Sequence, residues 1–223
     1  MLLLVTGCGG EREGPFFPLA PGWEWQYRVR VQTADGAEEL RQQVRTIGPE
    51  RVDGFPAWTR VRADGSRFYY REDRSGIHRI GSRPPDGGYR PEAEERLVLG
   101  RPFRHGTRWR QQELTSLLQR TGPPQETRYR IRVAVPVDYV IVAADEVVEV
   151  PAGRFTGCLR VEGEGETSAD AGNYVGNIRV RLSSSSWYCP GAGLVREERV
   201  ERTSNRLIPE GRMVMELQGL HHP

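Results

Sequence analysis

The chain has 223 residues and a mass of 25.3 kDa, the size of one ordinary domain or two very small ones. Its 32 basic and 30 acidic residues leave a formal net charge of +2, which argues against a dedicated nucleic-acid surface. No apolar run reaches the roughly 18 residues that a membrane-spanning helix requires.

The amino terminus resembles a bacterial lipoprotein signal. Residues 1–6 are mostly apolar, and Val5-Thr6-Gly7-Cys8 resembles a lipobox, where the bond before the cysteine is cut and the cysteine is lipidated. The match is incomplete, because there is no positive charge and the apolar region is shorter than the usual stretch of about 7–15 residues. We therefore expect the translation start to lie upstream of Met1. The alternative is a chance apolar start beside a stray cysteine.

On the lipoprotein hypothesis, the chain divides into three parts. Residues 1–7 are the remnant of a signal peptide, residues 8–16 form a lipidated tether beginning at Cys8, and residues 17–223 form a single β-rich domain. The lipid anchors the protein to a membrane, since each buried CH₂ contributes about 0.8 kcal/mol. The residue after the cysteine is glycine rather than aspartate, which by analogy with enteric bacteria predicts the outer membrane, facing the periplasm.

Alternation of apolar and polar residues predicts strands along the first half of the chain. Tryptophan, tyrosine and valine alternate with polar residues over 23–32. Further strands are predicted over 38–47, 57–62, 67–71 and 77–80, with turn signals such as Asp53-Gly54 and Asp64-Gly65 between them. Residues 82–91 are rich in proline and glycine and predict a long loop.

The second half continues the pattern. A short apolar run at 97–99 is followed by a predicted strand over 107–113. Leu114, Leu117 and Leu118 have helical spacing and predict one or two helical turns. Arginine and apolar residues alternate most regularly over 128–135, and strands over 137–150, 155–161, 178–188, 194–202 and 213–217 complete the series.

This pattern predicts an all-β fold, an antiparallel meander of roughly ten to twelve strands forming a curved sheet, half-barrel or barrel. Nearly every predicted strand has one apolar face and one face rich in arginine and glutamate. Because no amphipathic helix is available as a cover, the sheet must bury its own apolar face and leave the charges in water. The large aromatic residues are the predicted core anchors and ligand-cavity lining: Trp23, Trp25, Tyr27, Trp58, Trp109 and Phe155.

Two cysteines remain once Cys8 is assigned to lipid, and an exported compartment would allow a disulfide between Cys158 and Cys189. The alternation places both on the polar faces of their strands. A symmetric hairpin turning near Asp170 would set Cys158 opposite Leu182 and leave Cys189 roughly 23 Å away, whereas a disulfide needs α-carbons within about 7 Å. A bond therefore requires a bulge, another pairing or a corner, and the alternative is two free thiols.

Three stretches resemble motifs of a largely uncharacterised family of small bacterial envelope lipoproteins, some of them labelled TapB-like. They are the opening from Phe16 to Tyr27 (FFPLAPGWEWQY), the strand entry from Val150 to Phe155 (VPAGRF), and the corner from Trp187 to Val195 (WYCPGAGLV). They occur in the family's order, although the region between the first two has no matching motif. The resemblance implies an envelope location and a β-rich fold, and it brings no established catalytic residues.

No motif in the sequence carries chemistry. His78 and His105 lack a second histidine or a cysteine at metal-ligand spacing, and neither Gly-x-Ser-x-Gly nor His-Glu-x-x-His occurs. Neighbouring carboxylates such as Glu197 and Glu198 would point to opposite faces of a strand. The serine run over 183–186 is interpreted as polar filler. We therefore predict no enzyme activity, no cofactor and no metal.

The leading hypothesis is a non-catalytic cell-envelope lipoprotein whose β-rich domain binds an apolar or lipid-like ligand, because a curved sheet can enclose an apolar cavity. The alternative is a structural or assembly lipoprotein that docks onto an envelope protein complex through an exposed apolar patch. A hydrolase is the third hypothesis, and it would require a cluster of perturbed titratable groups inside a cleft.

Overall fold

The computed structural model describes residues 14–122, 127–170 and 176–222. These residues form fourteen strands and contain no helix. The strands are β1 (Glu24–Thr33), β2 (Gly36–Val52), β3 (Phe55–Arg62), β4 (Arg67–Glu72), β5 (Gly76–Arg83), β6 (Arg90–Gly100), β7 (Arg108–Leu114), β8 (Gln119–Gly122), β9 (Thr127–Arg130), β10 (Ala134–Val150), β11 (Gly153–Asp170), β12 (Asn177–Cys189), β13 (Gly193–Thr203) and β14 (Glu210–His221).

Twelve of the strands form one antiparallel sheet in the order β6-β5-β4-β3-β2-β1-β14-β13-β12-β11-β10-β7. The first and last strands of the chain, β1 and β14, pair in the middle of this order. The two edge strands, β6 and β7, follow one another in the chain and lie side by side, so the sheet is nearly closed into a barrel. Strands β8 and β9 pair separately. The predicted all-β fold class is confirmed.

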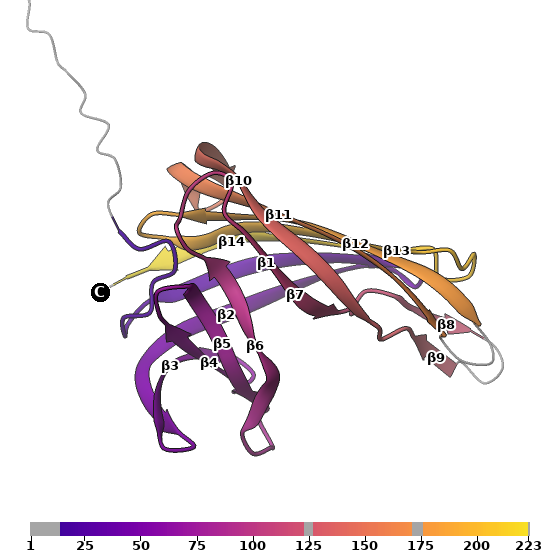
Figure 1. Ribbon diagram of the computed structural model, residues 1–223, viewed down its shortest axis with the longest axis horizontal. Helices are drawn as coiled ribbons and strands as arrows, with labels where there is room; N and C mark the ends of the chain where they lie inside the picture. The colour runs from indigo at the N-terminus through magenta and orange to yellow at the C-terminus, as the bar shows by residue number, and fades with distance from the viewer. Residues whose placement is uncertain (1–13, 123–126, 171–175, 223) are drawn as a thin grey trace, which may run out of the picture.

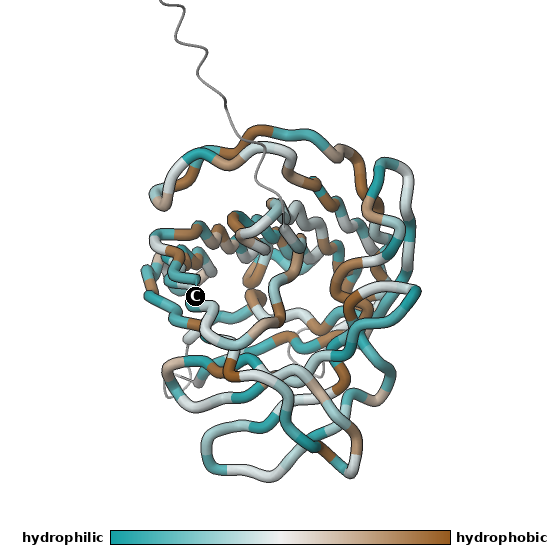
Figure 2. Tube along the Cα trace, turned by 90° about the vertical axis from the view of Figure 1, so that its left-hand side faces the viewer, coloured by the Kyte–Doolittle hydropathy of each residue, from teal (hydrophilic) through white to brown (hydrophobic). Residues whose placement is uncertain are grey.

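The long strands give the molecule its shape. Figure 1 shows β10 to β14 running along its length, while the shorter strands β3 to β6 lie beneath one end and the β8–β9 pair lies at the other. Seen from the end in Figure 2, hydrophobic and hydrophilic positions alternate along the strands. This is the period-two pattern that places successive side chains on opposite faces of a sheet.

Side chains rather than a backbone ladder close the barrel between β6 and β7. Among the described residues, β6 pairs only with β5 and β7 only with β10. Arg96 on β6 forms an ion pair with Glu113 on β7, with Nη2 2.5 Å from Oε1. Gly100, at the end of β6, lies against Trp109 of β7, and a Cβ there would be 2.8 Å from the indole ring. We call this line of contact the seam.

Three large groups of buried side chains form the core. The proximal cluster, next to the amino-terminal segment, contains Phe17, Leu19, Ile77, Leu99, Ile141, Leu159, Val161 and Tyr188. The distal cluster contains Leu118, Ile131, Val135, Val137, Ile178, Val180, Leu182 and Ile208. The disulfide cluster contains Trp25, Tyr27, Val29, Val44, Val148, Phe155, Cys158, Cys189, Ala192, Val195, Met215 and Leu217.

Cys158 and Cys189 form a disulfide, with their α-carbons 4.1 Å apart. The register that argued against the bond was wrong, because it assumed a hairpin symmetric about Asp170, whereas Asp170 pairs with Asn177. The observed register brings the two cysteines directly opposite. A cross-link closing a separation of 31 residues stabilises the fold by about 3–4 kcal/mol in the loop-entropy account.

Alternation predicted that both cysteines lie on a solvated face of the sheet, and this prediction was wrong. Both are fully buried in the disulfide cluster. Alternation correctly separates Cys158 from its neighbour Leu159, which belongs to the proximal cluster. It fails on exposure, because the face that carries Cys158 is also covered at this end of the sheet, with Phe155 and Val195 in the same cluster.

Two local predictions between β7 and β10 were also wrong. Residues 115–118 form no helical turn. The regular alternation over 128–135 is not one strand, because β9 ends at Arg130 and β10 begins at Ala134. Thr115 explains both. Its backbone N–H donates to the carbonyl of Val133 (3.0 Å), while its hydroxyl oxygen accepts from Val133 N–H (2.9 Å) and donates to the carbonyl of Ile131 (2.7 Å). The intervening segment therefore pairs with Thr115 instead of continuing a strand.

The predicted signal remnant and the lipidated Cys8 lie outside the described residues. The end of the predicted tether belongs to the folded body, since Phe16 packs edge-on against Phe103 and the Pro15 carbonyl accepts a hydrogen bond from Gly191 N–H. Over the described part of the chain, no helix has the length and apolar character to span a bilayer.

Candidate functional site

A cavity of about 290 Å³ lies inside the barrel, between the proximal and distal clusters. Along β12 the inward positions change from apolar to polar and back, in the order Ile178, Val180, Leu182, Ser184, Ser186 and Tyr188. The first three belong to the distal cluster, the two serines line the cavity, and the tyrosine belongs to the proximal cluster and also lines the cavity. A polar space is therefore held between two apolar ends.

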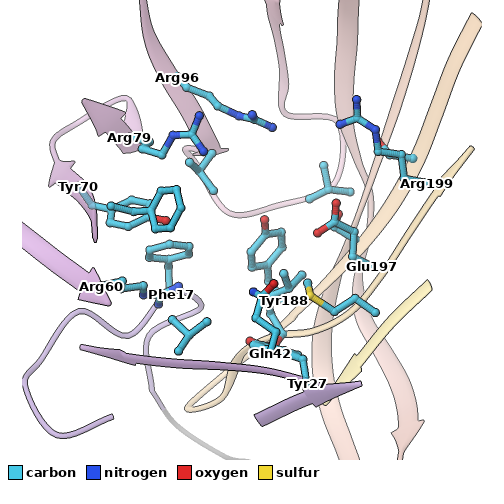
Figure 3. Close-up of a pocket in the computed structure, with 18 of the residues that line it drawn as sticks. Phe17, Tyr27, Gln42, Arg60, Tyr70, Arg79, Arg96, Tyr188, Glu197 and Arg199 are labelled. Atoms are coloured by element: carbon cyan, nitrogen blue, oxygen red, sulfur yellow. The ribbon is translucent and has the colours of Figure 1, made fainter. Parts of the chain in front are cut away.

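The wall of the cavity is strongly basic and aromatic. Five arginines and one glutamate line it: Arg60, Arg62, Arg79, Arg96, Arg199 and Glu197. Six aromatic side chains share the wall: Phe17, Tyr27, Phe68, Tyr70, Tyr139 and Tyr188. Figure 3 shows that these groups come from both sides of the barrel, with Arg60 and Tyr70 on one side and Glu197 and Arg199 on the other.

Arg60 of β3 is the most deeply buried of these arginines, at 8% exposed. Its guanidinium carbon lies 3.7 Å from the centre of the Phe17 ring and 4.5 Å from that of Trp25, both within cation–π range. Its Nη2 donates to the carbonyl of Pro18 over 2.8 Å, whereas its Nε has no hydrogen-bond partner. Burial lowers the pKa of Arg60, although arginine stays protonated at physiological pH.

Glu113, reaching inward from β7, joins the two walls of the barrel near the seam. Its carboxylate is 1% exposed and lies 2.5 Å from Arg96 and 3.3 Å from Arg199. It also accepts hydrogen bonds from the Tyr139 hydroxyl (2.9 Å) and from the amide of Gln111 (2.7 Å). A carboxylate shared by two arginines and two neutral donors is fully compensated, so these groups form a fixed wall.

A second buried carboxylate, that of Glu201, extends this network toward the distal cluster. Glu201 is fully buried and pairs with Arg199 over 2.8 Å. It also accepts hydrogen bonds from the backbone N–H groups of Ser116 and Leu117, the nearest at 2.9 Å. The segment after β7 is therefore tied to β13 by one glutamate.

Glu197 and Tyr188 are among the cavity-wall residues whose polar groups have no protein partner in the described structure. Glu197 makes no ion pair or hydrogen bond, and burial raises the pKa of its carboxyl, with Arg199 and Arg96 opposing the rise. Tyr188 likewise makes no hydrogen bond through its hydroxyl, which points in among the lining residues in Figure 3, and burial raises its pKa. Both groups are free to bind water or a ligand.

The cavity can bind a molecule but lacks the parts of a hydrolytic site. It holds no histidine, cysteine or paired carboxylates among its lining residues. The one serine–histidine contact of the described chain lies elsewhere, on the turn between β4 and β5, where Ser75 Oγ is 2.7 Å from His78 Nε2. That serine hydroxyl also donates to Asp73 (2.6 Å), whose carboxylate caps the turn, and Glu95 is 3.8 Å from His78 Nδ1. We interpret this group as a turn cap. A serine nucleophile needs a histidine that is hydrogen-bonded to an acid, and the 3.8 Å between Glu95 and His78 is too long for a hydrogen bond.

The structure separates the six aromatic residues predicted to line a cavity. Tyr27 lines it, and its hydroxyl donates to the carbonyl of Leu194 over 2.9 Å. Trp25 is 1% exposed in the disulfide cluster, where its Nε1 donates to the Ala192 carbonyl over 2.7 Å. Trp58 packs against the proximal cluster.

Trp23, Trp109 and Phe155 also lie outside the cavity wall, so Tyr27 alone of the six predicted residues lines it. Trp109 stacks on Tyr139 with ring centres 5.4 Å apart. Trp23 and Phe155 line a separate hollow beside Gly191. The expected apolar lining therefore needs correction, because the cavity wall is mixed and carries five arginines.

The arginines of the cavity were missed because alternation shows which residues share a face but not which face points inward. On β3, Ala57 and Thr59 are buried on one face, while Arg60 lies on the other and lines the cavity with Arg62. The expectation that all charged faces lie in water was wrong here. A usable signal was present in β12, where Ser184 and Ser186 interrupt the apolar stripe.

Two solved structures align with nearly the whole chain at low similarity. One is a protein of Bacteroides fragilis NCTC 9343, inferred to be exported and assigned a YmcC-like fold. It is 13% identical with a TM-score of 0.41, and the alignment covers 94% of this chain and 100% of that one. The other is an inferred lipoprotein of Parabacteroides distasonis ATCC 8503, 14% identical with a TM-score of 0.40, covering 94% and 99%. Neither similarity is high enough to support a conclusion about function.

No family model and no curated protein matches the chain. The resemblance to TapB-like lipoproteins therefore stays a prediction from the sequence motifs.

Proposed function

We propose that the protein is a non-catalytic binding protein of the bacterial cell envelope, and that its barrel holds a small organic ligand. One observation carries the proposal: Glu197 and the Tyr188 hydroxyl line the cavity with no partner in the described protein. Buried polar groups almost always have hydrogen-bond partners, so a cavity that presents free ones is suited to receive a polar molecule.

The envelope location is part of the proposal and has two supports. Residues 5–8 resemble a lipobox, which would place a lipid on Cys8 and hold the protein at a membrane, in our proposal the outer membrane facing the periplasm. The Cys158–Cys189 disulfide fits an exported protein, because disulfides persist in oxidising compartments and are rare in the cytosol.

The cavity favours a compact ligand over a whole lipid. At about 30 Å³ for each water-sized group, 290 Å³ holds roughly ten non-hydrogen atoms, fewer than a long acyl chain contains. Its wall mixes arginine and aromatic surface, so a ligand with both a polar group and an apolar body fits better than a purely apolar one. The proposal thus keeps a ligand-binding lipoprotein and changes the ligand expected from the sequence.

Filling the cavity tests the proposal. The full chain is recovered from the membrane fraction, where its presence tests the anchor, then emptied and reloaded with a small-molecule extract of the envelope. Native mass spectrometry should show a bound species on the wild type. Ser184→Trp, which puts a large ring into the cavity, should remove it. Ser185→Trp, on the opposite face of the same strand, should retain it. The absence of any bound species, or equal loading of the two variants, would reject the proposal.

The alternative of docking onto an envelope complex gains no support. The exposed large apolar side chains come from five separate parts of the fold, β2, β3, β7, β10 and the turn before β14: Leu40, Ile47, Phe55, Leu114, Val147 and Leu207. Nothing observed in the described residues groups them into one apolar face, and single exposed apolar residues are normal on a protein surface.

A further inference from the structure

Arg60 differs from the paired arginines of the cavity wall. Three of those have a carboxylate partner: Arg79 with Glu92 (2.6 Å), Arg96 with Glu113 (2.5 Å) and Arg199 with Glu201 (2.8 Å). In the residues that the structure describes, no carboxylate forms an ion pair with Arg60 or with Arg62, two positions further along β3. Arg60 is also more than nine-tenths buried.

A buried guanidinium without an anion is costly, because its hydration is lost and only partly replaced. Stacking on Phe17 and Trp25 and one hydrogen bond to Pro18 replace some of it, but the Nε–H stays without an acceptor. The same donors are what a carboxylate or phosphate binds, since the planar fork of arginine matches two oxygens at once. The site therefore lacks one anionic partner.

The surroundings of Arg60 also limit the rest of the ligand. In Figure 3 Phe17 and Tyr70 lie beside Arg60 on the same side of the cavity, while Tyr188 lies toward Glu197, and all three line the cavity. A ligand with a flat or ring-shaped body would pack well against these aromatic faces. The whole ligand would have about ten non-hydrogen atoms, the size estimated above. On the far side, Glu197 and Tyr188 offer hydrogen bonds to a hydroxyl or amine at the other end of the ligand.

We infer that the ligand of this cavity is a compact organic acid, whose carboxylate or phosphate pairs with Arg60 while its body packs against Phe17 and Tyr70. This inference rests on the proposed function, since it names the ligand class of the same cavity. No covalent step is involved.

Three ring-bearing probes of similar size and one small anion test it on the disulfide-bonded full chain by isothermal titration calorimetry. Benzoate and phenyl phosphate carry an anion and a ring, benzamide is the neutral analogue, and inorganic phosphate lacks the ring. We expect at least one ring-bearing anion to bind about tenfold or more tighter than benzamide and than inorganic phosphate. Tighter binding of phenyl phosphate indicates a phosphate ligand, and tighter binding of benzoate a carboxylate ligand.

Arg60→Met should abolish the preference for the anion, so that anion and amide bind equally. Arg154→Met, which removes an arginine that is 66% exposed and paired with Glu149 on the outside, should change neither affinity. If Arg60→Met does not fold, Arg60→Lys keeps the charge without the planar fork and should weaken the anion about tenfold.

The outcomes separate the two proposals. The inference that the ligand is an organic acid is rejected if benzoate, phenyl phosphate and benzamide bind equally to the wild type. It is also rejected if the preference for the anion survives in both Arg60 variants. In either case the cavity can still be a binding site. Binding of none of the probes, while a native species still loads the wild type but not Ser184→Trp, overturns the acid alone. Failure of the probes together with failure to load any native species overturns the proposed function as well.

Discussion

At the scale of single residues, the molecule departs from a simple barrel by turning charged side chains inward. Arg60, Glu113, Arg199 and Glu201 are all buried or nearly so, and the last three compensate each other in one network. Such networks contribute little net stability but leave a large penalty when one member is removed. Glu197 lies beside this network without belonging to it, and its protonation is therefore open to measurement.

Glu197→Gln should make the protein relatively more stable as the pH rises. Burial raises the pKa of the Glu197 carboxyl above its ordinary value of 4.5, and nearby Glu113 adds to the rise. Between these two pKa values the folded state binds more protons than the unfolded state, so the free energy of unfolding falls as the pH increases. Well below pH 4.5 the carboxyl is mostly neutral in both states, and the stability of the variant should approach that of the wild type. Above that, its relative stability should grow until the raised pKa is passed.

Urea denaturation at intervals from pH 4 to pH 8 measures this difference. Glu198→Gln is the matched control, because Glu198 is the next residue of β13 and pairs with Arg196 over 2.6 Å. A gain of the same size and pH dependence in both variants would show that the effect is general to the strand. If the free energies of unfolding of Glu197→Gln and the wild type change in parallel with pH, the pKa of Glu197 is not raised in the folded state.

At the scale of elements, the seam between β6 and β7 depends on Glu113. Glu113→Gln keeps hydrogen-bonding groups for Tyr139 and Gln111 but leaves Arg96 and Arg199 without their shared charge. Breaking a buried pair costs about 3–5 kcal/mol. Because Arg96 is a third exposed, we expect a loss of about 2 kcal/mol or more in the free energy of unfolding.

The control for this prediction is an ion pair that links β7 to its neighbour β10 on the outer face of the sheet. Asp138→Asn breaks the outward pair between Asp138 and Arg110 of β7, which is more than half exposed on both sides. Exposed pairs contribute little, so this variant should unfold at nearly the wild-type urea concentration. Equal losses in the two variants would mean that burial of the seam network does not matter to stability.

The elements also show how far sequence patterns reach. Period-two alternation locates β1, β4, β12 and β14 because each residue's own neighbours determine it. The segment at Leu117 and Leu118 has helical spacing, yet its hydrogen bonds are decided by Thr115 and Glu201, the latter more than 80 residues away in sequence. Such partners cannot be read from a local window.

The site was harder to predict than the strands for the same physical reason. Both faces of β3 are buried, so neither the apolar face with Ala57 nor the arginine face identifies the inside by itself. Which face points inward follows from how twelve strands close, and that depends on pairing between β1 and β14 at opposite ends of the chain. Tyr27 lines the cavity while Trp25, on the same face of β1, does not, so alternation along one strand does not separate cavity wall from packed core.

At the scale of the whole molecule, the sheet has a strong middle and a weak closure. Strands β11, β12 and β13 are paired on both sides by long ladders, and the disulfide links the first two of them. Strands β6 and β7 are each paired on one side only, and among the described residues their mutual contact consists of side chains. The barrel should therefore open first along the seam.

Hydrogen exchange tests this order of opening. The free energy of local opening ranges from about zero at weakly held elements to the global value in the core. Hydrogen-bonded amides of β6 and β7 should exchange about thirty-fold or more faster than those of β12, corresponding to about 2 kcal/mol of local stability. Glu113→Gln should speed exchange in these two strands further while leaving β12 changed only by the global loss. If the amides of β6 and β7 are as protected as those of β12, the seam is as firmly closed as the rest of the sheet. A ligand would then have to enter the cavity by another route, because the only part of the twelve-stranded sheet without a backbone ladder among the described residues would not be the part that opens.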